Sequence, residues 1–426
     1  MHTLLFLEPG HFHATLTLRV PNPRVADEIV VYATDGPELA DFLSLVERFN
    51  GRADRPTRWR PLVILDADPL GRLVGERKGD AVVLAGKNGG KARTIRRLHE
   101  AGFHVLADKP WLVEPADLAD IRASLGDWPL AMEIMTGRHD LAARCFNRLA
   151  GTPAVFGRLA EGEPSIELTG VHQLWKLVDG VPLRRPAWFF DVRVQGSGAV
   201  DIPTHMVDQT QWLLESTGAG ASDTTPCLVS ARAWPTRVPE DAFRLIVGAD
   251  AFPRQLAPFV DGDGLDYVCN ADLVYQIGGV TARAATRWEL SPTPATADAH
   301  AVIARGTRAD LVLEQGAHTG HRRRLFVEPR AHGAEIARAV AETLADVSGV
   351  GVTAVGAERY EVTIPAALDA GHESQFTRVL DEFVATIDER RWPAERGART
   401  LAKYTLLAEA AARASTPNPT HEEEPR

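Results

Sequence analysis

The sequence predicts an α/β fold in which an N-terminal doubly wound parallel sheet precedes a C-terminal α+β domain with a large, mostly antiparallel open sheet. Over residues 1–137, short continuous apolar runs alternate with helical patterns, which is typical of a parallel sheet covered on both faces. After residue 138, several runs alternate apolar with polar residues, which is typical of a sheet with one wet face. The length of 426 residues favours two or three domains.

The N-terminal elements follow one another as strand and helix in turn. Six apolar runs are predicted strands: 4–7, 29–33, 63–65, 81–84, 103–106 and 130–134. Helices are predicted from about His13, over 37–49 and over 91–101, where Gly102 is a C-cap signal. We therefore expect residues 1–137 to form a nucleotide-binding domain.

The remainder of the chain mixes both kinds of element. Helices are predicted over 141–149 and 200–214, and strands over 242–247, 282–290 and 309–314. Two closing helices are expected over 375–390 and 400–412. We assign 138–415 to a domain for substrate and oligomer contacts, and 416–426, which has no apolar residue, to a disordered tail.

Composition excludes several classes of function. The net charge is −10 and no long basic block is present, which disfavours nucleic-acid binding. Three widely spaced cysteines, without a CxxC pair, favour reduced thiols over a disulfide framework or zinc site. No run reaches the ~20 apolar residues of a membrane span, and the first residues lack a basic leader. We expect a cytoplasmic enzyme acting on a small molecule, with no metal.

Lys109, Asp201 and His205 are the candidate catalytic residues. Lys109 ends a buried strand and precedes Pro110, so its ammonium would open into the crevice at that sheet edge, and the Lys–Pro bond is a candidate cis bond. Asp201 and His205 would share one face of the predicted helix 200–214. Together such groups can hold an alcohol oxygen and move its proton.

Simpler interpretations of these residues stay open. Lys109 alone could be a surface lysine, and Asp201 could cap a helix that carries a core histidine. A metal held by Asp201, His205 and Asp208 is a further alternative.

The candidate cofactor site is the first strand–helix turn, residues 8–14. Gly10 can be the glycine that lets backbone approach a pyrophosphate, although Glu8 and His13 stand where two further glycines are usual. Asp35 ends the second strand, where a carboxylate holds the adenosine ribose and repels a 2′-phosphate; a helix cap is the alternative. Asn88, in a Gly-rich loop after the fourth predicted strand, is a further candidate ligand, or part of an ordinary turn. NAD is therefore favoured over NADP.

The order of these motifs resembles the Gfo/Idh/MocA oxidoreductases, the family of glucose–fructose oxidoreductase and inositol dehydrogenase. That family's "AGKHVxxEKP" stands here at 101–110 with Asp108 for glutamate, and its "GGGxxxDxxxHxxD" stands at 196–208 with Ser197 for the middle glycine. The resemblance covers about residues 1–215. The turn at 8–13, which lacks two of the family's glycines, looks like that of a less-studied branch.

The resemblance implies a Rossmann domain, an α/β domain whose open sheet makes oligomer contacts (a homodimer or tetramer), and NAD(P)-dependent chemistry on sugars, cyclitols or polyols. It implies that Lys109, Asp201 and His205 are catalytic. Cofactor-binding places fall on Gly10, His11, Phe12, His13, Asp35, Asn88, Asp108, Lys109 and Trp188. Aromatic residues beside charged groups suit a carbohydrate, and substrate-binding places fall on Lys109, Arg138, His172, Lys176, Asp201 and His205.

Two other functions remain open at this point. Some relatives keep the cofactor bound and cleave glycosides by transient oxidation and elimination. A non-catalytic sugar or nucleotide sensor is also compatible with the altered glycine turn, although a sensor has no need of a proton-transfer set.

Overall fold

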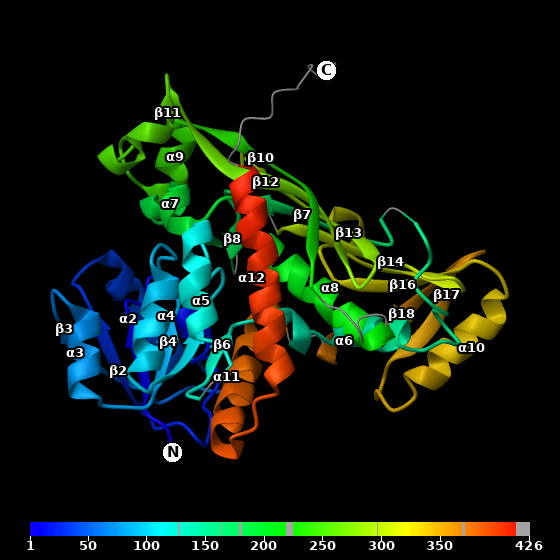
Figure 1. Cartoon of the computed structure of the whole chain (residues 1–426), viewed down its shortest axis with the longest axis horizontal. Coiled ribbons are helices and arrows are strands. Elements are labelled where there is room, and N and C mark those ends of the chain that lie inside the picture. The colour runs from blue at the N-terminus through cyan, green and yellow to red at the C-terminus, as the bar shows by residue number, and fades with distance from the viewer. Residues whose placement is uncertain are drawn as a thin grey trace.

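The computed structural model describes residues 1–126, 128–162, 164–178, 181–218, 225–295, 297–368 and 371–414. Figure 1 shows two sheets that lie side by side, with the last helix, α12 (Ala394–Ala414), running along their junction. The predicted tail 416–426 lies outside the described residues. In the part of the chain that is described, no helix is long and apolar enough to span a membrane.

The N-terminal sheet has six parallel strands in the order β3-β2-β1-β4-β5-β6. These strands are Leu4–Leu7 (β1), Glu28–Ala33 (β2), Arg60–Leu65 (β3), Ala81–Leu84 (β4), His104–Ala107 (β5) and Ala131–Glu133 (β6). The order reverses between β1 and β4, and ligands of doubly wound sheets bind beyond the carboxyl ends of the strands at such a switch point. The predicted doubly wound sheet is confirmed.

Helices cover both faces of this sheet, so its strands are apolar on both sides. One face packs against α3 (Pro69–Glu76), α4 (Lys91–Glu100), α5 (Leu118–Ala123) and α12. The other packs against α1 (His13–Leu16), α2 (Pro37–Asn50) and α11 (Gly371–Glu389), whose Phe376 and Phe383 lie in the same apolar cluster as Phe6. Late segments of the chain thus complete the first sheet.

The second sheet has ten strands, and its main path is β10-β12-β13-β7-β14-β15-β16-β18-β17. These strands are Ile166–Gln173 (β7), Cys227–Pro239 (β10), Val260–Asp261 (β11), Gly264–Ile277 (β12), Val280–Glu289 (β13), Ala299–Arg305 (β14), Ala309–Gln315 (β15), Arg324–Pro329 (β16), Gly351–Gly356 (β17) and Arg359–Thr363 (β18). Only β13 and β7 pair in parallel among the described strands of this sheet. The large, mostly antiparallel sheet is therefore confirmed.

One face of the second sheet packs against α6 (Leu141–Ala150) and α8 (Pro203–Thr217). Three further helices, α7 (Val192–Gln195), α9 (Glu240–Val247) and α10 (Gly333–Thr343), lie around the sheet, and β8 (Leu177–Val178) pairs with β9 (Val181–Pro182). On the opposite face, side chains such as Glu167, Arg283 and Ile303 stay partly exposed. This is the open face that the alternating pattern predicts.

Three predicted elements are wrong in kind or extent. The stretch 242–247 is helix α9 and not a strand, because Phe243 and Ile246 bury one helical face between Pro239 and Gly248, which is left-handed at φ 81°. The helix after His13 has only four residues. Finally, α8 begins at Pro203, so Asp201 lies in the turn before it, and Asp201 and His205 do not share a helix face.

Candidate active site and cofactor cleft

Lys109 and Asp201 meet where the two sheets adjoin. Lys109 follows β5 and is joined to Pro110 by a cis peptide bond, as the sequence indicates. Its Nζ donates to Asp201 Oδ1 at 2.5 Å and to the Asp201 carbonyl at 3.4 Å. The side chains are only 9% and 6% exposed. A buried cation and a buried carboxylate therefore form a pair between residues 92 positions apart.

Gln195 joins this pair to the Gly-rich loop. Its Nε2 donates to Asp201 Oδ2 at 3.3 Å, and its backbone carbonyl accepts from Asn88 Nδ2 at 2.8 Å. Asn88 N and Gly89 N donate to the Val194 carbonyl at 3.0 and 2.9 Å. The loop after β4 is thus fixed to α7, and Asn88 is fixed close to Asp201.

His205 lies in the first turn of α8 and is partly exposed. Its charge acts on Asp208, one turn further along the helix. Burial favours the neutral form of Asp208, but Arg138 and Lys403 outweigh burial and hold its pKa well below the usual range. Arg138 contacts Asp208 through Nε and a terminal nitrogen, at 3.0 and 3.1 Å. Among the described residues, Asp201, His205 and Asp208 do not bring their ligand atoms within 4.8 Å of one another, and each of the two carboxylates is paired with a cation.

A cleft of about 400 Å³ opens at the carboxyl ends of β1, β2 and β4. Gly10 and Gly86 line it, and their backbones are close together: a Cβ on Gly86 would lie 2.4 Å from the Glu8 carbonyl oxygen and 3.2 Å from Gly10 N. Only glycine permits this approach. The cleft occupies the position where doubly wound sheets hold a dinucleotide.

Glu8 takes the place of the usual first glycine and adopts the left-handed backbone that glycine favours, at φ 46°. Its carboxylate accepts from Thr34 N at 2.9 Å and from Thr34 Oγ1 at 3.3 Å. These bonds connect the end of β1 to the end of β2. Asp35, the next residue, is exposed. Two carboxylates therefore follow the ends of neighbouring strands here.

Trp188 lies beyond the first sheet in sequence but contacts Glu38, which lines this cleft. Its Nε1 donates to Glu38 Oε1 at 3.1 Å, and Glu38 Cγ lies 3.5 Å from where a Gly10 Cβ would be. Trp188 is buried. It therefore joins the 3₁₀ turn Ala187–Phe190 to the entrance of α2.

Lys91 begins α4, lines the cleft and makes two hydrogen bonds. Its Nζ donates to Asn88 Oδ1 at 2.5 Å and to the Asp108 carbonyl at 2.9 Å. Burial lowers the pKa of Lys91 to about 8. This ammonium can therefore change charge within a pH range that assays can reach.

The two histidines of the glycine-poor turn contact Asp108. His13 Nδ1 lies 2.9 Å from Asp108 Oδ2, and His11 Nδ1 lies 3.5 Å from it. Burial works against ionisation of Asp108, but these histidines hold its pKa well below the usual range. Phe12, between them, contacts both rings with centroids 4.6 Å apart. The ligand atoms of His11, His13 and Asp108 lie within 4.8 Å of one another, so the set has the spacing of metal ligands.

His172 and Lys176, both predicted to contact substrate, share one carboxylate. Asp298 Oδ2 lies 3.3 Å from His172 Nδ1 and 2.5 Å from Lys176 Nζ. His300 stacks edge-on with His172, and burial together with the His172 charge lowers its pKa to about 3. His172, Asp298 and His300 also have ligand atoms within 4.8 Å of one another. Lys176 already neutralises Asp298 there.

The sequence-predicted site residues thus form several separate groups, among them His11 and His13 around Asp108 and Arg138 on Asp208. Sequence reasoning missed residues that hold two further groups together. Lys109, Asp201 and Asn88 are brought together through Gln195, whereas His172 and Lys176 gather around Asp298. Gln195 and Lys91 carried a usable signal, because each adjoins a glycine pair at a predicted loop. Asp298 carried none.

Known proteins resemble this chain over nearly its whole length. The family described as "Putative oxidoreductase C terminal domain" matches residues 146–415. A crystal structure of a "putative oxidoreductase" from Parabacteroides merdae is 34% identical, with 97% of each chain covered and a TM-score of 0.90. A comparison with curated proteins gave no significant match.

More distant structures share the fold. One is a 3-ketoreductase from Actinomadura kijaniata in complex with NADP and TDP-benzene, at 15% identity, TM-score 0.55 and 96% and 97% coverage of this and that chain. Another is levoglucosan dehydrogenase in complex with NADH and levoglucosan, at 16% identity, TM-score 0.59 and 97% and 98% coverage. The two-sheet fold, the paired Lys109 and Asp201, and the family match agree: the chain belongs to the Gfo/Idh/MocA oxidoreductases, in the branch that carries this C-terminal domain.

Proposed function

We propose that the protein is an NAD-dependent oxidoreductase that transfers hydride between nicotinamide and a CH–OH group of a sugar, cyclitol or related polyol. The observation that carries the proposal is the 2.5 Å contact of Lys109 with Asp201, which adjoins the cleft through Gln195 and Asn88. In this proposal residues 1–137 bind the cofactor, and residues 138–415 supply the substrate pocket.

The cleft fits a dinucleotide. Gly10 and Gly86 line the cleft, their close backbone approach leaves no room for a Cβ on Gly86, and Lys91 places a cation in the same lining for a diphosphate. Asp35 and Glu8 present carboxylates at the end of β2, which favours a ribose with free hydroxyls and repels a 2′-phosphate. This supports NAD over NADP. When bound, nicotinamide supplies the hydride acceptor or donor.

The chain's own residues would handle the proton. Asp201 holds the Lys109 ammonium in one orientation, and that ammonium can donate to a substrate hydroxyl oxygen and stabilise its developing charge. We assign the proton of the hydroxyl to His205, which is partly exposed at the start of α8. His172 and Lys176, with Arg138, are proposed to select the substrate.

The relatives named above support the substrate class, because two of them are a ketoreductase and a dehydrogenase of a sugar. We also propose that the open face of the second sheet joins copies of the chain into a dimer or tetramer. The partly exposed Trp234 and Ile303 on that face support this.

The direct test is to incubate purified protein with NAD or NADP and a panel of sugars and polyols, and to follow absorbance of the reduced nicotinamide. We expect turnover with NAD, and its loss in Lys109→Ala. Lys78→Ala, which alters an exposed lysine, is the matched control. Absence of turnover in the wild type, together with no cofactor binding by calorimetry, would refute the proposal.

Two other results would redirect the assignment. Glycoside cleavage without net reduced cofactor, with stoichiometric NAD released on denaturation, would indicate a recycled cofactor. Sugar binding that is unaffected by Lys109→Ala, in a wild type without turnover, would indicate a sensor.

A further inference from the structure

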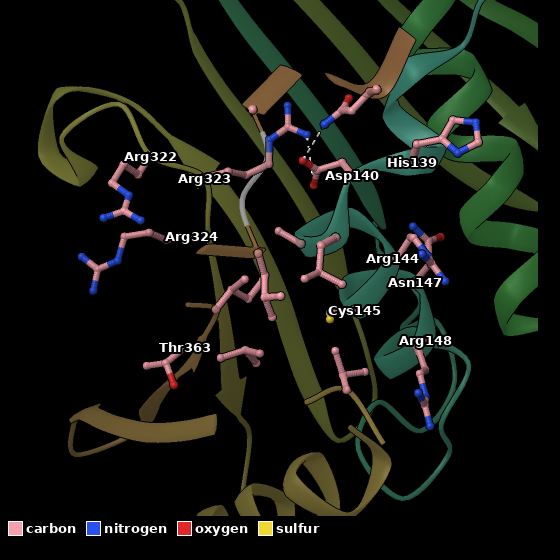
Figure 2. Close-up of a pocket in the computed structure, with 18 of the residues that line it drawn as sticks. His139, Asp140, Arg144, Cys145, Asn147, Arg148, Arg322, Arg323, Arg324 and Thr363 are labelled. Carbon is pink, nitrogen blue, oxygen red and sulfur yellow. Dashed lines mark hydrogen bonds and ion pairs between the residues drawn. The ribbon is translucent and has the colours of Figure 1, made fainter. Parts of the chain in front are cut away.

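A large cavity lies among residues 139–378, apart from the cofactor cleft. Its volume is about 1030 Å³, and no residue lines both the cavity and the cleft. Its walls come from α6, the end of α8, the segment entering β16, β18 and the first turns of α11. Figure 2 shows Arg322 and Arg324 on one side of this cavity and Arg144 and Arg148 on the other.

The charges around this cavity are unequal. Six arginines line it: Arg144, Arg148, Arg322, Arg323, Arg324 and Arg378. Among the residues that the structure describes, three carboxylates line it, and each is paired with a different arginine. Arg148 contacts Asp346 at 2.6 Å, Arg323 contacts Asp140 at 3.3 Å, and Arg324 contacts Glu361. The arginines therefore exceed the carboxylates by three.

Arg144, Arg322 and Arg378 are the arginines left over. None of the three has a carboxylate within ion-pair distance among the residues that the structure describes. They come from three separate elements, namely α6, the segment before β16, and α11. All three are exposed to solvent, and they give this cavity an excess of positive charge in a chain whose net charge is −10. A bound anion would offset their mutual repulsion.

We propose that this cavity binds the phosphate group of a small organic phosphate monoester. A guanidinium fork matches phosphate oxygens, and a dianion can accept from forks that approach from several sides, whereas one carboxylate has only two oxygens to share. Leu141, Val362 and Ile364 supply an apolar wall for the organic part. The volume is that of a small-molecule site.

The test is calorimetric titration of the full chain with glucose 6-phosphate, glucuronate and glucose, each with and without saturating NAD. We expect glucose 6-phosphate to bind one site in both conditions, with affinity falling as salt rises. The variant Arg322→Ala/Arg378→Ala should weaken that binding by at least about tenfold. Arg338→Ala, which removes an exposed arginine of α10 outside the cavity, is the matched control and should bind as the wild type does.

Three outcomes would overturn the proposal. Unchanged affinity in the double arginine variant would place the phosphate elsewhere. Complete displacement by NAD would place it in the cofactor cleft. Equal affinity for glucuronate would indicate a general anion site instead of a phosphate site. None of these readings depends on turnover, so the cavity proposal and the oxidoreductase proposal can fail separately.

Discussion

At the residue scale, Asp201 decides how the proposed chemistry is organised. It accepts from both Lys109 and Gln195, and it is 6% exposed on its side chain. Asp201→Asn keeps the shape but removes the charge that orients the ammonium. We expect kcat to fall by about 10²- to 10⁴-fold with little change in circular dichroism. Asp272→Asn, which alters a carboxylate paired with Arg283 on the open sheet face, is the control. Activity within a few-fold of the wild type in Asp201→Asn would contradict the assigned role.

We expect Lys91 to make the proposed binding of NAD depend on pH. Its pKa is about 8 in the folded protein, below the ordinary 10.5, because it is buried. An anionic diphosphate beside it favours the protonated ammonium, so affinity should be constant below pH 8 and fall above it, by at most about tenfold per pH unit. Calorimetric titration with NAD, from about pH 6 to about pH 9.5, measures this change in affinity. The profile should flatten in Lys91→Met. A wild-type profile that rises above pH 8 would show the opposite sign.

Some of the candidate site could be predicted from residue order, and some could not. Lys109 and Asp201 were found because each adjoins a distinctive local pattern, a strand end with proline and a Gly-Ser-Gly turn. Asp298 could not be found, since its partners His172 and Lys176 lie more than a hundred residues away and only the sheet brings them together. Local sequence patterns can identify site residues that lie at turns. Site residues that meet across a sheet can be identified only when the register of the strands is known.

At the element scale, α12 is anchored by a buried polar cluster. Lys403 and Tyr404 both donate to Glu133 at the end of β6, and Tyr404 also accepts from Trp111 N at 2.9 Å. Burial raises the pKa of Glu133 despite the Lys403 charge. Lys403→Met would leave this carboxylate unpaired, and we expect the free energy of unfolding to drop by about 3–5 kcal/mol.

Urea denaturation would measure the loss, with Lys78→Met as the exposed control. Lys403→Met/Glu133→Gln should recover part of the lost stability, because it also removes the unpaired charge. No loss in the single variant would mean that water or a neighbour replaces the ammonium.

The same scale explains which elements the sequence predicts well. Continuous apolar strands such as β4 are predicted closely, because burial on both faces requires an uninterrupted apolar run, and elements at the surface do not have such a run. The strand predicted over 242–247 is wrong, because its apolar residues Phe243 and Ile246 fit a short helix equally well. The left-handed Gly248 that follows is typical of the end of a helix. A short apolar run is compatible with both the helical and the strand periodicity, and tertiary packing determines which of the two forms.

At the scale of the whole molecule, the two sheets are connected by more than one chain crossing. The chain leaves the first sheet after β6, builds the second, and returns through α11, whose Phe376 and Phe383 pack under β1. Next, α12 contacts α5, α8 and β10. The cofactor cleft lies within the first part, and the Lys109–Asp201 pair joins the first part to the second. Because the two parts are connected at several places, we expect a fixed distance between the cleft and this pair.

The open face of the second sheet gives the last prediction. Trp234 lies on it between Arg232 and Arg287, with guanidinium-to-ring distances of 5.4 and 5.7 Å, and it is only partly buried. A large aromatic flanked by arginines is a composition enriched at protein interfaces. We expect a dimer or tetramer by light scattering, and a shift toward monomer in Trp234→Asp, because the substitution removes the aromatic surface that a second copy would cover. Leu245→Asp, at an exposed position of α9, is the control and should keep the assembly of the wild type. A monomeric wild type at micromolar concentration would show that this face is solvated.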